Sequence, residues 1–197
     1  MALLDGWTKR TFSGGGLTRD TYRRGAGPGV IVIHEIPGLT PSVIRFAEDV
    51  VAAGFTVVMP SLVGEPEKPV SQGYLAQSMM RVCIAKEFTT WATGRSSQVS
   101  GFLRALARDV HEQCGGPGVG AVGMCFSGGF ALGMMVDGHV AAPVLSQPSL
   151  PFAVGKGRSE DLNLDADDLA AVKRRVADGC QVLGLRFDGD QIGRAHV

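Results

Sequence analysis

Apolar residues fall into short runs separated by longer amphipathic stretches, and the two patterns alternate along most of the chain. The runs are rich in β-branched residues and bounded by Gly or Pro, which is typical of buried strands. We predict strands over Val30–Ile33, Phe55–Met59, Val119–Met124, Ala141–Leu145 and Gln181–Phe187. Thr18–Arg24 is expected to be an early strand at the edge of the sheet.

Between these runs, apolar positions recur at the spacing of one helix face. Helices are predicted over Ser42–Ala53, Gln72–Phe88, Gln98–Gln113, Phe126–Val136 and Asp165–Ala177. Ser42 and Asp165 are expected to cap their helices through side-chain oxygens. Strands that alternate with helices of this length imply right-handed crossovers, so we predict an α/β protein with a doubly wound, mostly parallel sheet.

Length, composition and charge narrow the class of protein. The 197 residues fit one domain, and 45% are hydrophobic and 19% charged, as in ordinary globular proteins. The net charge is zero, which predicts no attraction to nucleic acid or to an anionic membrane. Because the sequence has no apolar run long enough to span a bilayer and no secretory signal, we expect a cytoplasmic protein.

The cysteines offer one candidate for chemistry. Cys83, Cys114, Cys125 and Cys180 are scattered, without the Cys/His spacing of a zinc site, so they are expected to be thiols and no metal is implied. Only Cys125 has a sequence context that indicates catalysis. It lies in Val119–Gly129, which reads VGAVGMCFSGG.

This segment has the form of a nucleophile elbow, a sharp turn from a strand into a helix, with Cys in place of the usual Ser. The residues two before and two after the nucleophile must be small, which Gly123 and Ser127 satisfy. The backbone N–H of Phe126 would supply half of an oxyanion hole. Two other interpretations remain open: Ser127 could be the nucleophile, or the segment could be a Gly-rich turn that Cys125 merely fills.

The elbow resembles that of dienelactone hydrolases, whose nucleophile is Cys, and whose members carry a glutamate after an earlier strand as in HEIPG, His34–Gly38. The resemblance covers about Val30 to Asp190 and implies an α/β-hydrolase fold. It implies that Glu35 holds the resting thiol and moves away when substrate binds. The Ile36 backbone N–H would then be the second oxyanion donor.

The resemblance also implies a catalytic acid after a late strand. In RFDGDQ, Arg186–Gln191, the pair Gly189-Asp190 matches the context of that acid, and Asp190 follows the nucleophile as the fold's chain order requires. Asp188 is the neighbour most easily confused with it. Asp-Gly-Asp is also an ordinary turn sequence, so the assignment of Asp190 rests mainly on order and spacing.

A catalytic histidine should follow the acid, after one further strand. His196 comes six residues after Asp190, too soon for that strand to intervene. His34 precedes Glu35 and should face another direction, and His111 and His139 are expected to be solvated. We therefore predict that the chain lacks its catalytic histidine, together with the last strand and helix of the fold.

The final residues suggest why. Ile192–Val197 match the translation of one reading frame of a common sequencing adapter. We therefore expect residues 1–190 to form a single, incomplete α/β-hydrolase domain, and residues 191–197 to be a non-native tail.

Together these features predict a hydrolase of lactones or carboxylic esters that acts on a small molecule through a Cys125 acyl-enzyme, with no cofactor. This chain itself is predicted to be inactive. The alternatives are a flavodoxin-like cysteine hydrolase or amidotransferase, and a non-catalytic thiol-redox or binding protein. Several of the former place His directly after the elbow Cys, where this chain has Phe126.

Overall fold

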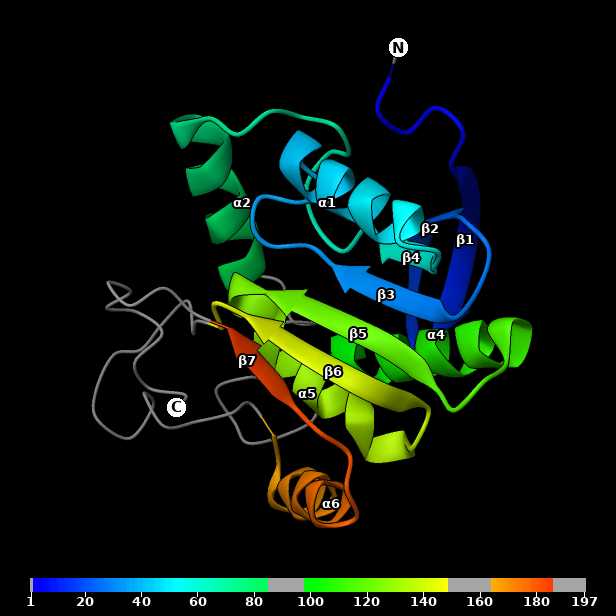
Figure 1. The fold of residues 1–197 in the computed structure, drawn as a ribbon. Coiled ribbons are helices and arrows are strands. Elements are labelled where there is room, and N and C mark those ends of the chain that lie inside the picture. The colour runs from blue at the N-terminus through cyan, green and yellow to red at the C-terminus, as the bar shows by residue number, and fades with distance from the viewer. Residues whose placement is uncertain (1, 85–97, 149–163, 186–197) are drawn as a thin grey trace.

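A twisted sheet runs through the centre of the computed structural model (Figure 1), which describes residues 2–84, 98–148 and 164–185. Within these residues the sheet has seven strands in the order β1-β2-β4-β3-β5-β6-β7. The strands are β1 (Thr8–Gly14), β2 (Leu17–Arg24), β3 (Gly29–Ile33), β4 (Thr56–Pro60), β5 (Val119–Met124), β6 (Val140–Ser146) and β7 (Leu183–Leu185). From β4 to β7 every pairing is parallel, whereas β1, β2 and β4 pair antiparallel.

Helices cover both faces of this sheet. They are α1 (Pro41–Ala52), α2 (Gln72–Ile84), α4 (Gln98–Cys114), α5 (Gly128–Met134) and α6 (Ala166–Ala177), with 3-10 turns η2 (Cys125–Ser127) and η3 (Met135–Asp137) around α5. In Figure 1, α1 lies on one side of the sheet and α4 and α5 on the other. The predicted doubly wound α/β architecture is therefore confirmed.

Each face of the sheet has its own apolar core, because side chains alternate along a strand. On β3, Ile31 and Ile33 pack with α4 and α5, whereas Val30 and Val32 pack with α1. All five residues of β3 are buried, as are all five of β4. These strands therefore read as continuous apolar runs, which is why the sequence locates them well.

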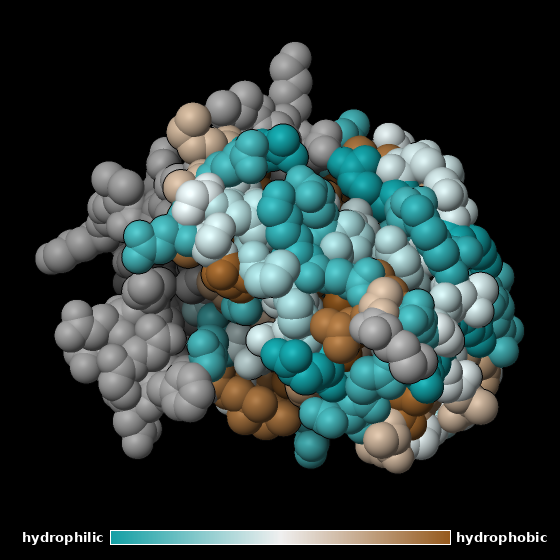
Figure 2. All heavy atoms as spheres, turned by 90° about the horizontal axis from the view of Figure 1, so that it is seen from above, coloured by the Kyte–Doolittle hydropathy of each residue, from teal (hydrophilic) through white to brown (hydrophobic). Residues whose placement is uncertain are grey.

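The outer surface differs sharply from these cores. Figure 2 looks down on the end of the molecule that carries α1, where hydrophilic residues predominate and hydrophobic ones gather in small groups. Among the described residues, no helix combines the length and the apolar content that a membrane crossing requires.

The sequence misplaces the amino-terminal edge of the sheet. Thr18–Arg24 was expected at the edge, but β2 pairs on both sides, and β1 is the edge strand. Most residues of β1 are exposed, and Phe12 is its one large apolar residue. Its partly buried face carries only Phe12 and Gly14, so the strand shows almost no alternation of apolar and polar residues and hydrophobic periodicity does not detect it.

Capping residues were predicted for two helices, and one of them is wrong. The side chain of Thr40, not Ser42, caps α1 by accepting from the backbone N–H of Val43, and Pro41 occupies the first turn. Proline favours that position because its missing N–H has no partner inside the helix anyway. Asp165 caps α6 as predicted, accepting from the N–H of Asp168 at 2.8 Å.

Most other boundaries agree with the prediction to within one residue, and two elements differ by more. The single helix expected over Phe126–Val136 is divided into η2, α5 and η3. Of the strand expected over Gln181–Phe187, Leu183–Leu185 is a strand, and residues 186 and 187 lie outside the described residues. Within the described part of the chain, β7 pairs only with β6, and its two leucines are about half exposed.

A partly buried ion pair links the helices behind the sheet. The Arg104 guanidinium on α4 contacts the Asp168 carboxylate on α6 at 2.5 Å and donates to the Gly133 carbonyl on α5 at 2.9 Å. Both charged side chains are mostly shielded from solvent. Loss of one partner would leave the other buried without its counter-charge, which is costly.

We predict that Asp168→Asn lowers the free energy of unfolding by about 3 kcal/mol, because it leaves the Arg104 charge uncompensated. Asp167→Asn is the matched control, since Asp167 lies in the same helical turn but is exposed. The control should cost less than about 0.5 kcal/mol. Urea unfolding of both variants measures this difference, and equal losses would contradict the prediction.

Candidate active site

Cys125 directly follows β5 and begins the turn η2. Its φ is 55°, in the left-handed region that residues with a side chain rarely adopt. Such a conformation costs on the order of 1–3 kcal/mol and persists only where the surrounding structure enforces it, often at functional sites. The strained turn expected of a nucleophile elbow is therefore present at Cys125.

Close backbone packing enforces this turn. A Cβ on Gly123 would lie 2.3 Å from the Ser127 carbonyl oxygen, and one on Gly128 would lie 2.8 Å from the Pro148 side chain. Neither position accepts a larger residue without movement of the backbone or of Pro148. Small residues are thus required on both sides of Cys125.

Ser127 is completely buried, and its hydroxyl is committed to the backbone. It accepts from the Met124 N–H at 2.8 Å and lies 2.8 Å from the Met124 carbonyl and 3.1 Å from the Ile33 carbonyl. A hydroxyl enclosed in this way is closed to substrate, which argues against the alternative in which Ser127 is the nucleophile. Its contact with Ile33 links the elbow to the end of β3.

The register of the sheet places the segment that carries Glu35 next to the turn that carries Cys125. Ile33 on β3 pairs with Gly123 on β5, so the residues two further along each strand leave the sheet side by side. Ile36 and Cys125 both border the core cluster that includes Phe126. The structure thus brings together the ends of the two strands that carry four of the predicted site residues.

Glu35 is half-buried, and burial raises the pKa of its carboxyl above the ordinary value. Among the described residues, its carboxylate forms no hydrogen bond or ion pair that would oppose this effect. A carboxyl in such a place keeps its proton to higher pH than an exposed one.

His34 is fully buried and does not face the site. One ring nitrogen, Nδ1, lies 2.7 Å from the Glu35 carbonyl oxygen, and Nε2 accepts from the Leu62 N–H at 2.9 Å. Burial lowers the pKa of His34 from 6.5 to about 4. With both nitrogens occupied by the backbone, His34 is not available as a catalytic base.

The other histidines do not supply that base within the described residues. The rings of His111 and His139 lie 5.7 Å apart, and the His139 carbonyl accepts from the first residue of β5. That is the opposite end of β5 from Cys125. Asp188, Asp190 and His196 fall outside the described residues, and no group of three or more His, Cys, Asp or Glu in the described part could hold a metal ion.

The end of β6 adds a feature that the sequence did not reveal. Met124 pairs with Ser146, so Gln147 leaves β6 next to Cys125, and it too is left-handed, with a φ of 49°. Its N–H donates to the Leu185 carbonyl at 2.6 Å. The carboxyl ends of β3, β5, β6 and β7 are thereby joined at one edge of the sheet.

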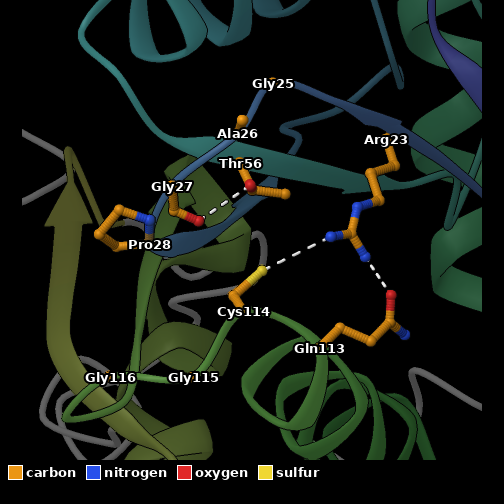
Figure 3. A pocket seen from close by; sticks show the side chains of 10 residues that line it. All are labelled: Arg23, Gly25, Ala26, Gly27, Pro28, Thr56, Gln113, Cys114, Gly115 and Gly116. Atoms are coloured by element: carbon orange, nitrogen blue, oxygen red, sulfur yellow. Dashed lines mark hydrogen bonds between the residues drawn. The ribbon is translucent and has the colours of Figure 1, made fainter.

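A cavity of about 450 Å³ lies at the opposite end of the parallel strands, where they begin (Figure 3). It is lined by Pro28, Thr56 and Gly115–Gly116, which precede or begin the parallel strands. The Arg23 guanidinium points toward Gln113 and the Cys114 sulfur, which it contacts at 3.6 Å. Because ligands of parallel α/β sheets bind at the carboxyl ends of strands, this cavity is separate from the candidate site.

Comparison with known proteins identifies the family. The sequence model of the dienelactone hydrolase family matches residues 18–155, and the chain belongs to this family. The match includes both the HEIPG segment and the elbow. Membership supports a hydrolase of esters or lactones. No curated protein matches the chain in sequence.

Solved structures agree on the fold. A protein from Klebsiella pneumoniae subsp. pneumoniae, assigned as a dienelactone hydrolase, is similar with a TM-score of 0.59 and 15% identity, over 93% of this chain and 85% of the other. A second structure, named m3DLH, gives a TM-score of 0.52 at 18% identity, over 95% of this chain and 84% of the other. These likenesses establish the predicted α/β-hydrolase fold.

We predict that Gly123→Ala destabilises the elbow, because the new methyl group would collide with backbone rather than with a flexible side chain. The expected loss is about 2–3 kcal/mol of unfolding free energy, as for other overpacked sites. Gly120→Ala on the same strand is the control, since its methyl would lie 3.3 Å from a Val30 side-chain carbon. Urea titration of both should give a clearly smaller loss for the control.

We also predict that the buried His34 makes stability depend on pH. Its pKa falls from 6.5 to about 4 on folding, so between these values the unfolded chain binds more protons than the folded one. Stability should therefore be highest above pH 6.5 and decline as the pH falls to about 4, by about 3 kcal/mol in all.

Urea unfolding of the wild type and of His34→Asn across this range isolates the effect, because the variant has no titrating group at this position. The raised pKa of Glu35 acts with the opposite sign, since its stabilising contribution is lost as the pH rises. Glu35→Gln separates the two. An unchanged slope in His34→Asn would contradict the assignment.

Proposed function

We propose that this chain derives from a hydrolase of lactones or carboxylic esters in which Cys125 is the nucleophile. The observation that carries the proposal is the left-handed turn at Cys125, which lies at the end of β5 beside the end of β3. The carboxyl ends of neighbouring parallel strands lie there, which is where the active site of an α/β enzyme is expected. The burial of Ser127 supports Cys125 as the nucleophile, and the family match supports a hydrolase.

In the proposed reaction, the Cys125 sulfur attacks the carbonyl carbon of a small-molecule ester or lactone. The backbone N–H groups of Phe126 and Ile36 stabilise the oxyanion of the tetrahedral intermediate. Collapse breaks the carbon–oxygen bond of the ester, releases the alkoxide and leaves a thioester on Cys125. Water would then hydrolyse that thioester to complete the cycle.

Glu35 and Asp190 take supporting roles in this proposal. Glu35 would hold the resting thiol and move away on substrate binding. Its half-buried, raised-pKa carboxyl follows the strand next to β5, which supports this role, although in the structure it forms no hydrogen bond to a described residue. Asp190 would orient a catalytic histidine, which none of the histidines in the described residues supplies. Without that imidazole, neither protonation of a poor leaving group nor attack by water on the thioester is assisted.

We predict that the chain undergoes acylation at Cys125 without sustained turnover. The ester p-nitrophenyl acetate suits the test because its phenolate departs without needing a proton. Mixing should release about one equivalent of p-nitrophenolate, followed by negligible further hydrolysis, since triad members act as a unit. Peptide mass spectrometry should locate the acetyl group on Cys125.

Two variants serve as controls. Cys125→Ala should abolish the release. Ser127→Ala should still release p-nitrophenolate and carry the acetyl group on Cys125, though more slowly, and should lose about 1–3 kcal/mol of stability, because it removes the buried hydroxyl that satisfies the Met124 N–H and contacts Ile33. Acetylation of Ser127 instead would favour the alternative nucleophile. Rapid multiple turnover that disappears in Cys125→Ala would show that another group acts as the base.

A further inference from the structure

His34 connects two loops at the carboxyl ends of the strands, where the candidate site lies. It is the first residue after β3, and it directly precedes the Glu35–Ile36 peptide. Its ring is completely buried, which is uncommon for a histidine and requires that both nitrogens find partners. Those partners are backbone groups on two different loops.

The partners fix the tautomer of the ring. The Glu35 carbonyl oxygen, 2.7 Å from Nδ1, can only accept a hydrogen bond, so Nδ1 carries the proton. Nε2 is then unprotonated and accepts from the N–H groups of Leu62 and Val63, at 2.9 and 3.4 Å. The low pKa of His34 agrees with this neutral state.

We propose that His34 is a positioning residue that orients the Glu35–Ile36 peptide for oxyanion binding. The inference rests on the proposed function, in which the Ile36 N–H is an oxyanion donor. This peptide is trans, so its C=O and N–H point in opposite directions. Because the buried ring holds the Glu35 carbonyl toward the protein interior, the Ile36 N–H points away from the interior.

The second contact of the ring anchors the loop behind this peptide. Nε2 holds the backbone at Leu62 and Val63, and that backbone packs directly against the oxyanion loop. A Cβ on Gly38 would lie 2.6 Å from the Val63 carbonyl oxygen, and one on Gly64 would lie 2.0 Å from the Pro37 carbonyl oxygen. Two loops packed backbone to backbone leave the peptide little freedom to rotate away from the position that His34 sets.

Two substitutions separate these contacts. Asn places an amide N–H near the position of Nδ1 and can still donate to the Glu35 carbonyl. Gln places its amide near the position of Nε2, so it can accept from Leu62 but cannot reach the Glu35 carbonyl. Each variant therefore keeps one hydrogen bond and loses the other, which makes His34→Asn the matched control for His34→Gln.

Two reactions at Cys125 then report on the oxyanion donor. Acylation by p-nitrophenyl acetate passes through a tetrahedral oxyanion: the sulfur–carbon bond forms, p-nitrophenolate leaves with the bonding electrons, and the thiol proton goes to buffer. Alkylation by iodoacetamide replaces iodide at a saturated carbon and forms no oxyanion. Peptide mass spectrometry measures both rates at Cys125 alone, in the full chain.

We expect His34→Gln to slow acylation on the order of tenfold to a hundredfold, somewhat less than outright removal of an oxyanion donor. Alkylation should change less than about twofold, which also verifies that the elbow remains folded. His34→Asn should retain most of the acylation rate. Equal acylation in the two variants, or equal slowing of both reactions in His34→Gln, would overturn the inference.

Failure of the proposed function gives a different result. If Cys125 of the wild-type protein is alkylated but never acylated, the nucleophile assignment fails whatever His34 does. The NMR resonance of the Ile36 amide then decides the positioning role. A shift of that resonance in His34→Gln but not in His34→Asn supports the role, and matching positions in the two variants overturn it.

Discussion

The contact between the Ser127 hydroxyl and the Ile33 carbonyl holds the turn after β5 against the end of β3. The site depends on this approach, because the nucleophile and one oxyanion donor of the proposed mechanism come from different strands. The same hydroxyl satisfies the Met124 N–H where β5 ends. A turn strained at Cys125 is thus fixed from both sides, by its own strand and by the neighbouring one.

At the carboxyl ends of β3 and β5, hydrogen bonds from buried polar side chains therefore hold the backbone in place. Elsewhere in the sheet, apolar packing does so. Ser127 and His34 are both completely enclosed, and every contact described for their side chains is with the backbone. Satisfied buried hydrogen bonds add only modestly to stability, but breaking one is expensive, so they specify geometry more than they add free energy. At the ends of β3 and β5 these hydrogen bonds give the backbone groups one defined set of partners.

Local patterns predicted the parts of the fold that local physics determines. The β3 and β5 strands and the turn at Cys125 followed from β-branched runs and small residues, which act over a few positions. Whether Thr40 or Ser42 caps α1 depends on where the chain enters the helix, and both residues can cap. The bracing role of His34 depends on a loop 28 residues away, so no local pattern could indicate it.

The position of the proposed acid depends on β7, a short strand that pairs on one side only within the described sheet. The segment that carries Asp190 follows β7, whose strand pairing is limited to three residues of β6 and whose two leucines are about half exposed. The hydrogen bond from the Gln147 N–H to the Leu185 carbonyl extends that pairing by one step. Gln147 accepts a left-handed conformation to make it, next to the similarly strained Cys125. Left-handed residues therefore follow both β5 and β6 at this end of the sheet: Cys125 is the proposed nucleophile, and Gln147 bonds to the strand that precedes the proposed acid.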